Sequence, residues 1–290
     1  MLYIPNLIQD LDFHKNQKSV ANSPINSASN SRSPKFDNKS NLIRYKLTIE
    51  YDGKNYCGFQ KQLEIVQKSV EEVLQKAIFE LSQEQAKIFA CGRTDAGVHA
   101  LEHVVHFDLV KKFTPHQVVM ALNNFLRSEN VAVLSCEIVD ENFHARFSSK
   151  MRHYRYVIVN RSAPLVLQKN QAWHVSKKLD VAAMKQAAEF LIGEHDFSSF
   201  RDSDCQAKSA IRTIEKIEIF TPKKEEILIE ISAKSFLHHM VRNIVGTLAL
   251  VGRQKINAKD LKEILLAKDR TKSGPNAPAH GLYFLKSDYF

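Results

Sequence analysis

The feature of this sequence that most limits its fold is an order of segments, strand, helix, strand, strand, that occurs twice along the chain. In the first series, residues 42–51 alternate apolar with polar side chains, as a half-buried strand does. Residues 70–81 then place apolar side chains along one helical face, after Ser69 and Glu72 at capping-box spacing. The series also predicts strands over residues 87–91, 104–109 and 131–139, and a helix from Pro115 to about Arg127.

The second series begins near residue 147. It predicts, in order, a strand to Val159, a helix from Asp180 to Ile192, a hairpin of residues 211–220 and 226–233 that turns at Pro222-Lys223-Lys224, and an apolar helix over residues 236–251. Residues 197–210 lack periodicity and are predicted to form a flexible loop. Two such series predict an α+β fold of two similar tandem halves, residues 43–147 and 148–290, each a mainly antiparallel sheet with helices on one face.

Residues 1–42 differ in composition from the rest of the chain. Between Asn16 and Asn41 there are six Asn and seven Ser and hardly any large apolar side chain. Such a segment buries too little surface to offset its ordering entropy, so we predict a disordered or loosely docked N-terminal extension. The first residues lack the basic start and the cleavage site of a secretory signal. No apolar run approaches the roughly 18 residues of a membrane span, so we expect no membrane association.

A short loop bounded by Gly92 and Gly97 carries the first candidate for chemistry, Asp95. Glycine tolerates backbone angles that other residues resist, so this segment can bend sharply and present the Asp95 carboxylate outward. The alternative is that Asp95 hydrogen-bonds its own turn, as Asp commonly does. A phosphate-binding P-loop is excluded, because Gly97 is followed by Val98 rather than by Lys and Ser or Thr.

The net charge of the chain, +9 with a pI of about 9.2, suits a polyanionic partner. Many basic proteins bind no nucleic acid, so the clustering of the charges is more informative than their sum. Residues 150–156 interleave Lys and Arg with Tyr, a composition that suits phosphates and stacked bases, or equally an exposed strand face. Arg146 and Arg152 are therefore candidates for RNA contact.

Arg242 lies in an otherwise apolar helix, where a charged side chain is seldom buried without a partner. We therefore expect Arg242 either to pair with Asp95 or to point into a cleft. His238 and His239 precede it, and we expect them to face the groove and the core, respectively.

A metal site is the alternative use of the histidines. His99, His103 and His106 lie close together in sequence and near Cys91. In a strand, however, His103 and His106 face opposite sides, and His99 lies about 13 Å from His103 at about 3.3 Å per residue. Metal ligands must converge at roughly 2.0 to 2.3 Å, so we predict no metal. The four cysteines lie far apart, which favours a reducing cytoplasm over a disulfide framework or a zinc ribbon.

The string from Cys91 to His99, Cys-Gly-Arg-Thr-Asp-Ala-Gly-Val-His, resembles the signature of the tRNA pseudouridine synthase A family. Ordered motifs extend the resemblance from about residue 43 to the C-terminus, at residues 50–53, 58–60, 143–147, 154–156, 193–197, 236–243 and 274–282. Phe59 is a departure, because we expect many relatives to have Trp there, but an aromatic side chain is kept. The segment before residue 43 lies outside the family pattern.

This resemblance implies two halves whose sheets join, an active cleft between them and two chains per functional unit. It implies a cofactor-free isomerase that converts uridine to pseudouridine at positions 38, 39 and 40 of the tRNA anticodon stem-loop, with Asp95 as the catalytic residue. Tyr154 is then placed against the extruded base. The remaining substrate-binding candidates are Arg93, Arg242, Arg146 and Arg152. Arg93 is either a partner that keeps Asp95 ionised or a phosphate clamp.

Two other classes of function stay open at this point. One is an RNA-binding protein without catalysis, built on the same basic groove. The other is a metal-dependent hydrolase acting on nucleic acid, which the spacing of the histidines disfavours.

Overall fold

The computed structural model describes residues 42–61, 66–203 and 205–289, and residues 40–290 form one compact unit. The prediction for residues 1–42 therefore lies outside the described residues, apart from Leu42. The predicted α+β class is confirmed. Over the described ranges, five α-helices accompany one sheet of ten strands, and most of the strand pairs are antiparallel.

The first half follows the predicted order closely. Its elements are β1 (Ile43–Tyr51), α1 (Val70–Ser82), β2 (Phe89–Ala90), β3 (His99–Leu109), α2 (Pro115–Phe125) and β4 (Val131–Val139). Both predicted helix starts are confirmed, because Ser69 with Glu72 and Thr114 with Gln117 form complete capping boxes. Strand β3 begins at His99, earlier than the predicted Val104. The first residues of β3 include polar side chains, which by themselves favour a surface position, although His99 and His103 are buried.

The second half contains the predicted elements and four more. The predicted elements are β5 (Met151–Asn160), α3 (Val181–Glu189), β8 (Ile211–Lys223), β9 (Glu226–Ala233) and α4 (Met240–Gly252). The additional elements are β6 (Trp173–Val175), β7 (Gly193–Asp196), α5 (Ala258–Ala267) and β10 (Leu282–Asp288). The hairpin turns after Lys223, where β8 pairs Lys223 with Glu226, slightly later than predicted. Helix α4 begins at Met240 rather than at residue 236, because His239 has a φ of 59° and cannot continue a right-handed helix.

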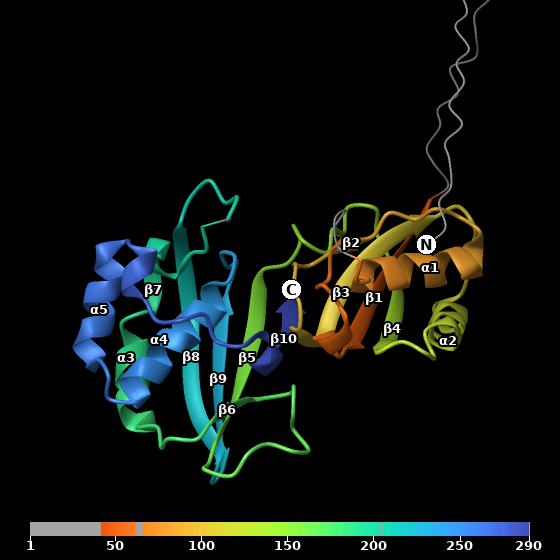
Figure 1. Cartoon of the computed structure of the whole chain (residues 1–290). Coiled ribbons are helices and arrows are strands. Elements are labelled where there is room, and N and C mark those ends of the chain that lie inside the picture. The colour runs from red at the N-terminus through yellow and green to blue at the C-terminus, as the bar shows by residue number, and fades with distance from the viewer. Residues whose placement is uncertain (1–41, 62–65, 204, 290) are drawn as a thin grey trace, which may run out of the picture. The chain divides into compact units, whose positions relative to one another are not determined.

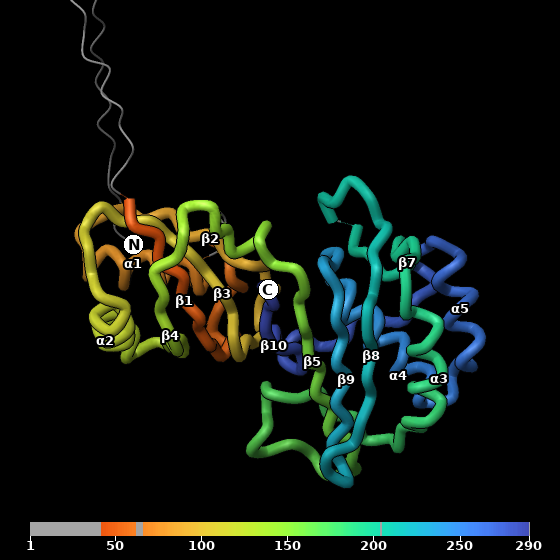
Figure 2. Tube along the Cα trace, turned by 180° about the vertical axis from the view of Figure 1, so that it is seen from behind, coloured from red at the N-terminus to blue at the C-terminus, as the bar shows by residue number. Residues whose placement is uncertain are grey.

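Strand β10 joins the two halves. The strand order is β4-β1-β3-β10-β5-β9-β8-β7, so the last strand in the chain lies in the middle of the sheet. It runs parallel to β3, with Tyr283 opposite His99, and antiparallel to β5, with Leu282 opposite Tyr156 (Figure 1). Figure 2 shows the same order from behind. The sheets of the two halves are therefore one continuous sheet.

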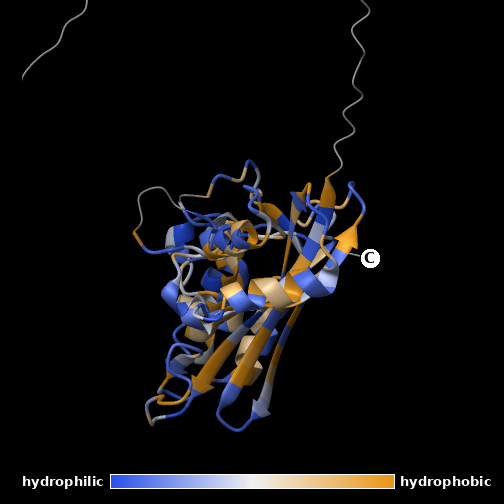
Figure 3. Ribbon diagram, turned by 90° about the vertical axis from the view of Figure 1, so that its right-hand side faces the viewer, coloured by the Kyte–Doolittle hydropathy of each residue, from blue (hydrophilic) through white to orange (hydrophobic). Residues whose placement is uncertain are grey.

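The helices cover one face of this sheet. On β1 the side chains of Tyr45, Leu47, Ile49 and Tyr51 are buried, whereas the residues between them are partly or fully exposed. In the second half, α3 packs against α4, α5 and β8. Figure 3 shows that hydrophobic residues concentrate on the strands and hydrophilic residues on the loops. Within the described ranges, none of the helices has both the length and the apolar character that crossing a membrane requires.

Candidate active site

The loop that carries Asp95 connects β2 to β3 and is held from outside. Gly97 has a φ of 79°, which favours glycine, whereas the φ of Gly92 lies outside the left-handed region, so only Gly97 uses the predicted freedom. The amide of Phe59 donates to the carbonyl of Thr94 at 3.1 Å, and Gly58 forms an isolated bridge with Asp95. A Cβ on Gly58 would lie 2.5 Å from the Thr94 carbonyl oxygen. This close approach fixes the backbone of Asp95.

The carboxylate of Asp95 is contacted by three side chains from the second half of the chain. Oδ2 lies 3.0 Å from Nη1 of Arg242 and 3.2 Å from Nε2 of His239, and Oδ1 lies 3.5 Å from Nε2 of His238. The pairing of Arg242 with Asp95, one of the two expected arrangements, is therefore present. Within the described part of the chain, no hydrogen bond joins the Asp95 carboxylate to its own turn, which was the alternative reading of this residue.

Asp95 is held in its charged form. Burial of the carboxyl group raises its pKa, but the hydrogen bonds and positive charges of His239 and Arg242 outweigh burial, so the pKa of Asp95 lies below its ordinary value of 3.8. The N-terminus of α4 lies at the same place, because His239 is its N-cap residue and Arg242 lies in its first turn, and a helix N-terminus also favours negative charge. The side chain keeps 24% of its surface exposed, so a substrate can reach it.

The expectation that His239 faces the core is wrong. This residue caps α4, and its left-handed backbone turns the ring toward two carboxylates. Nε2 faces Asp95, and Nδ1 lies 2.5 Å from Oδ2 of Asp202. The hydrogen bond to Asp95 raises the pKa of His239 above its ordinary value, although burial works against this. The ring of His238 stacks on it at 3.8 Å between centroids.

Arg242 is fixed from its far side. Its Nε donates to the carbonyl of Ala277 at 2.8 Å, and the amide of Ala277 donates to the carbonyl of Arg242 at 3.2 Å. The segment that contains Ala277 lies directly on α4, since a Cβ on Gly246 would lie 1.7 Å from the carbonyl oxygen of Pro275. The Arg242 guanidinium thus faces Asp95, while its Nε–H group is already hydrogen-bonded to Ala277.

Tyr154, from β5, lies beside the start of the Asp95 loop. Its ring packs edge-on against Phe236 at 5.0 Å and Phe284 at 5.2 Å. A Cβ on Gly92 would lie 3.9 Å from the Tyr154 hydroxyl. Burial, followed by the nearby Cys91 and Asp95, raises the pKa of Tyr154, so the phenol keeps its proton at neutral pH.

The other three arginine candidates are not brought to Asp95. Arg93 and Arg146 are exposed, and Arg146 lies 5.8 Å from the ring centroid of Phe147. Arg152 is buried, and its guanidinium donates to the backbone carbonyls of Cys91, Lys234 and Arg146. Its side chain is thus occupied by the protein itself.

One group of side chains has the spacing of a metal site. Ligand atoms of Asp95, His238 and His239 lie within 4.8 Å of one another. Arg242 contacts the same carboxylate, and His239 also contacts Asp202, so a cation there would have to displace a guanidinium and a proton. The three histidines considered from sequence contact different groups. His99 bonds to Asn170, whereas burial lowers the pKa of both His103 and His106 to about 4 and leaves them neutral.

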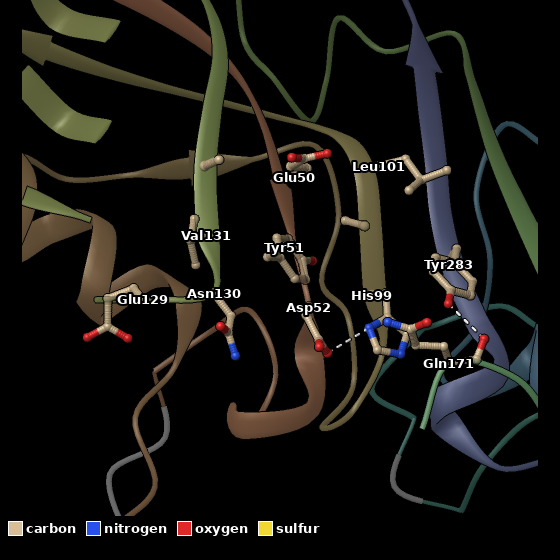
Figure 4. A pocket seen from close by; sticks show the side chains of 12 residues that line it. Glu50, Tyr51, Asp52, His99, Leu101, Glu129, Asn130, Val131, Gln171 and Tyr283 are labelled. Carbon is tan, nitrogen blue, oxygen red and sulfur yellow. Dashed lines mark hydrogen bonds and ion pairs between the residues drawn. The ribbon is translucent and has the colours of Figure 1, made fainter. Parts of the chain in front are cut away.

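A cavity of about 340 Å³ lies elsewhere, at the ends of β1, β3 and β10. Figure 4 shows its labelled lining side chains, among them Asp52 beside His99, and Tyr283 bonded to Gln171. Its lining includes Glu50, Asp52 and Glu129 but not Asp95. Three carboxylates repel phosphate, so this cavity is a poor site for RNA.

Sequence reasoning missed the bridge from Asp95 through His239 to Asp202. The available signal was the pair His238-His239 directly before an apolar helix with Arg242 in its first turn. Helical spacing alone sends neighbouring residues to different faces. The left-handed backbone of His239 is what brings both rings to Asp95.

Comparison with known proteins places the chain among close relatives. Residues 47–148 and 187–289 match the model of a family described as tRNA pseudouridine synthase. The chain is 49% identical to tRNA pseudouridine synthase A of Anaplasma phagocytophilum (strain HZ) over 247 residues, which cover 85% of this chain and 100% of that protein. It is 42% identical to tRNA pseudouridine synthase A of Orientia tsutsugamushi (strain Ikeda) over 285 residues, which cover 86% of this chain and 100% of that protein. A solved Cbf5-Nop10-Gar1 complex matches with a TM-score of 0.29 and 9% identity, over 70% of this chain and 53% of that chain, and this score is too low to carry an argument.

Proposed function

The chain belongs to the tRNA pseudouridine synthase family, and from that premise we propose that it forms pseudouridine at positions 38, 39 and 40 of the tRNA anticodon stem-loop, with Asp95 as its catalytic residue. The general activity, that of an isomerase acting on uridine in tRNA, follows from the family model and from both relatives. The proposed target positions and the role of Asp95 are supported by the ordered motifs of the sequence and by 42% and 49% identity to two proteins named tRNA pseudouridine synthase A.

The chemistry needs an ionised carboxylate. Pseudouridine formation breaks the bond between C1′ and N1, turns the uracil and joins C5 to C1′, while the hydrogen of C5 leaves as a proton and N1 takes up a proton. A carboxylate can attack C1′, stabilise positive charge there or remove a proton from the sugar, and all three roles require the charged form. The observation that carries the proposal is that Asp95 is partly exposed and is paired with Arg242 and His239, which keep it charged. No electrons are gained or lost in this isomerisation, so we propose that no cofactor takes part.

We propose that Tyr154 contacts the extruded base. Its ring is held by Phe236 and Phe284, and its protonated hydroxyl can donate a hydrogen bond to the uracil. Arg93 and Arg146 are exposed and therefore available to phosphates. Arg242 acts on the substrate indirectly, because it pairs with Asp95. Arg152 supports the site by hydrogen bonds to the backbone carbonyls of Arg146 and Cys91.

The assembly and location are also proposals. The family resemblance supports two chains per functional unit, which predicts a mass in solution of twice the 33.1 kDa of one chain. The wide spacing of the cysteines and the tRNA substrate support a cytoplasmic location. The pairing of Asp95 with Arg242 supports chemistry without a metal, which predicts that a chelator leaves activity unchanged.

Substitution of Asp95 by Asn tests the proposal. Asn keeps the shape of the side chain and loses the charge and the nucleophile, so the variant should fold and bind tRNA but form no pseudouridine. Release of tritium from 5-tritiated uridine in tRNA measures the reaction, because C5 gives up its hydrogen. Release within tenfold of the wild-type rate would contradict the role of Asp95. Asp180→Asn is a matched control, since Asp180 caps α3 and Asn caps helices equally well.

The target positions are tested with the substrate. Transcripts in which uridine 38, 39 or 40 is replaced singly by cytidine should lose the tritium that belongs to that position, and a transcript without all three should release none. Unchanged release from the triple replacement would mean that the enzyme modifies uridine elsewhere in tRNA, which leaves the general activity intact.

A further inference from the structure

His239 lies between two carboxylates that come from different parts of the chain. Its Nε2 is 3.2 Å from Asp95, and its Nδ1 is 2.5 Å from Asp202. An ionised carboxylate only accepts hydrogen bonds, so the Nδ1 that bonds to Asp202 carries a hydrogen, and a second hydrogen on Nε2, which faces Asp95, gives the imidazole a positive charge. We propose that His239 is a positioning residue, a protonated bridge that holds the Asp95 carboxylate in place and ties it to the segment of residues 197–202.

The backbone supports this reading. His239 has a φ of 59°, a conformation that residues with a Cβ rarely adopt, and such conformations gather where function requires them. The amide of Asn243 still donates to the carbonyl of His239 at 2.9 Å, so α4 keeps its first backbone bond. The left-handed conformation of His239 is therefore not needed for the first backbone bond of the helix. Its effect is to place the ring in contact with both carboxylates.

Asp202 is attached to both histidines. Its amide donates to the carbonyl of His238 at 3.3 Å, and its side chain bonds to Nδ1 of His239. Just before it, Phe197 and Phe200 are buried, and Asn243 donates to the carbonyl of Phe200 at 3.0 Å. The prediction of a flexible loop thus needs a correction here, since residues 197–202 are packed along the first turn of α4.

Among the described residues, Asp95, Asp202, Arg242 and His238 face the His239 ring. Asp95 and Asp202 favour its protonated form, whereas burial and the charge of Arg242 oppose it, and His238 stacks on it. The balance is positive, because the pKa of His239 is raised. The bridge is complete while both carboxylates are ionised and the imidazole is protonated. As the pH rises through the raised pKa, the ring loses one N–H, and one carboxylate loses its partner while Arg242 stays on Asp95.

This inference rests on the proposed role of Asp95, but its first test needs no catalysis. Histidine nitrogens of the full-length enzyme without tRNA are followed by NMR against pH, and the His239 signal is assigned from its absence in His239→Gln. We expect His239 to titrate above about 6.5 and its midpoint to fall by roughly half a pH unit or more in Asp202→Asn and in Asp95→Asn. Glu194→Gln is the charge-matched control. Glu194 is exposed on β7, and its removal should leave the midpoint unchanged.

The second readout is the single-turnover rate of tritium release against pH. A bridge predicts that Asp202→Asn moves the alkaline limb of this profile to lower pH by as much as it moves the NMR midpoint, whereas Glu194→Gln does not. A His239 midpoint at or below about 6.5, or one that ignores Asp202→Asn, would overturn the bridge. If Asp95→Asn still releases tritium, the proposed function fails instead, and the titration still decides whether the bridge exists.

Discussion

Arg152 shows how one guanidinium can join distant parts of a chain. It donates two hydrogen bonds to the carbonyl of Cys91, at 2.9 and 2.8 Å, and one each to the carbonyls of Lys234 and Arg146. Cys91 begins the loop of Asp95, and Lys234 follows β9 in the other half. A buried charge whose hydrogen bonds are made to the protein backbone in this way stabilises the backbone beside the Asp95 loop. The contribution of Arg152 to RNA binding is therefore indirect.

Arg152→Ala should therefore reduce stability rather than affinity alone. Removal of the side chain leaves the buried carbonyl of Cys91 and the part-buried carbonyls of Lys234 and Arg146 without this donor, which costs roughly 2–4 kcal/mol of unfolding free energy. Lys150→Ala, at an exposed position, should change it by less than about 0.5 kcal/mol. Urea denaturation of both variants makes the comparison. Equal stabilities for the two variants would show that the carbonyl groups find other donors.

Individual residues differ in how far the sequence determines them. Asp95 and Arg242 were predictable, because a carboxylate between glycines and a cation in an apolar helix are each unusual. The roles of His239 and Asp202 were not, because they depend on one left-handed residue and on a loop without periodicity. The basic neighbours of Arg152 predict an RNA contact, and only the fold shows that its side chain is buried.

Helix α4 is the element on which the site depends most. It carries His239 and Arg242 at its N-terminus, and its middle lies against residues 274–277. The amide of Gly274 donates to Oγ1 of Thr247 at 2.8 Å, and the carbonyl of Ala277 accepts from Arg242. The position of the Arg242 guanidinium therefore depends on the close contact at Gly246.

Gly246→Ala should destabilise the protein although Ala is the better helix former. The propensity gain is about 1 kcal/mol, whereas a Cβ placed 1.7 Å from the Pro275 oxygen forces the backbone apart, at a cost of roughly 3 kcal/mol or more. The turnover rate should fall as well, because Arg242 moves with the contact. At Gly92, where the nearest atom to a new Cβ is 3.9 Å away, the same change should be tolerated. Thermal unfolding of the two variants measures the difference, and similar melting temperatures would contradict it.

Most elements with local signals were predicted, whereas α5 was missed although Asn257 and Asp260 form a capping box at its start, and strands defined by distant partners were not predicted. Capping boxes and apolar stripes mark α1 and α2 in the sequence. Strands β6 and β7 are only three and four residues long, too short for an alternating pattern to be recognised. For β10, no local pattern could indicate that its neighbours would be β3 and β5.

The compact unit of residues 40–290 contains the Asp95 carboxylate and the three side chains that contact it. The site draws Asp95 from the first half and Arg242, His238 and His239 from the second, and the family match begins at residue 47. Neither half holds the complete site by itself. We therefore expect the reaction to depend on the joined sheet and not on the segment before it.

Deletion of residues 1–41 should leave catalysis largely intact. The composition of residues 16–41, rich in Asn and Ser, provides little apolar surface from which to build a cleft. Single-turnover rates of the full-length and the shortened protein at saturating tRNA make the measurement. A shortened protein that folds normally but loses most of its rate would show that this segment belongs to the active site or to the tRNA contact.

Binding of tRNA should weaken steeply with salt. The net charge of +9 attracts the phosphates, and each phosphate neutralised releases condensed counterions. Lys150→Ala should reduce the slope of log K against log salt by about one unit if Lys150 contacts the backbone of the RNA. Its exposed position makes it a cleaner probe than Arg152. An unchanged slope would direct the search for the RNA contact to Arg201, Lys208 and Arg212.

The central place of β10 has a consequence for how the protein is made. A ribosome delivers His99 and Tyr156 long before it delivers Tyr283 and Leu282, their partners in the sheet. Until residues 282–288 emerge, the nascent chain keeps β3 and β5 with unpaired edges, the state in which strands of neighbouring chains pair wrongly. Residues 282–288 must therefore emerge before the two halves can close around Asp95, and we expect a chain that stops before residue 282 to be inactive however much of the site it already contains.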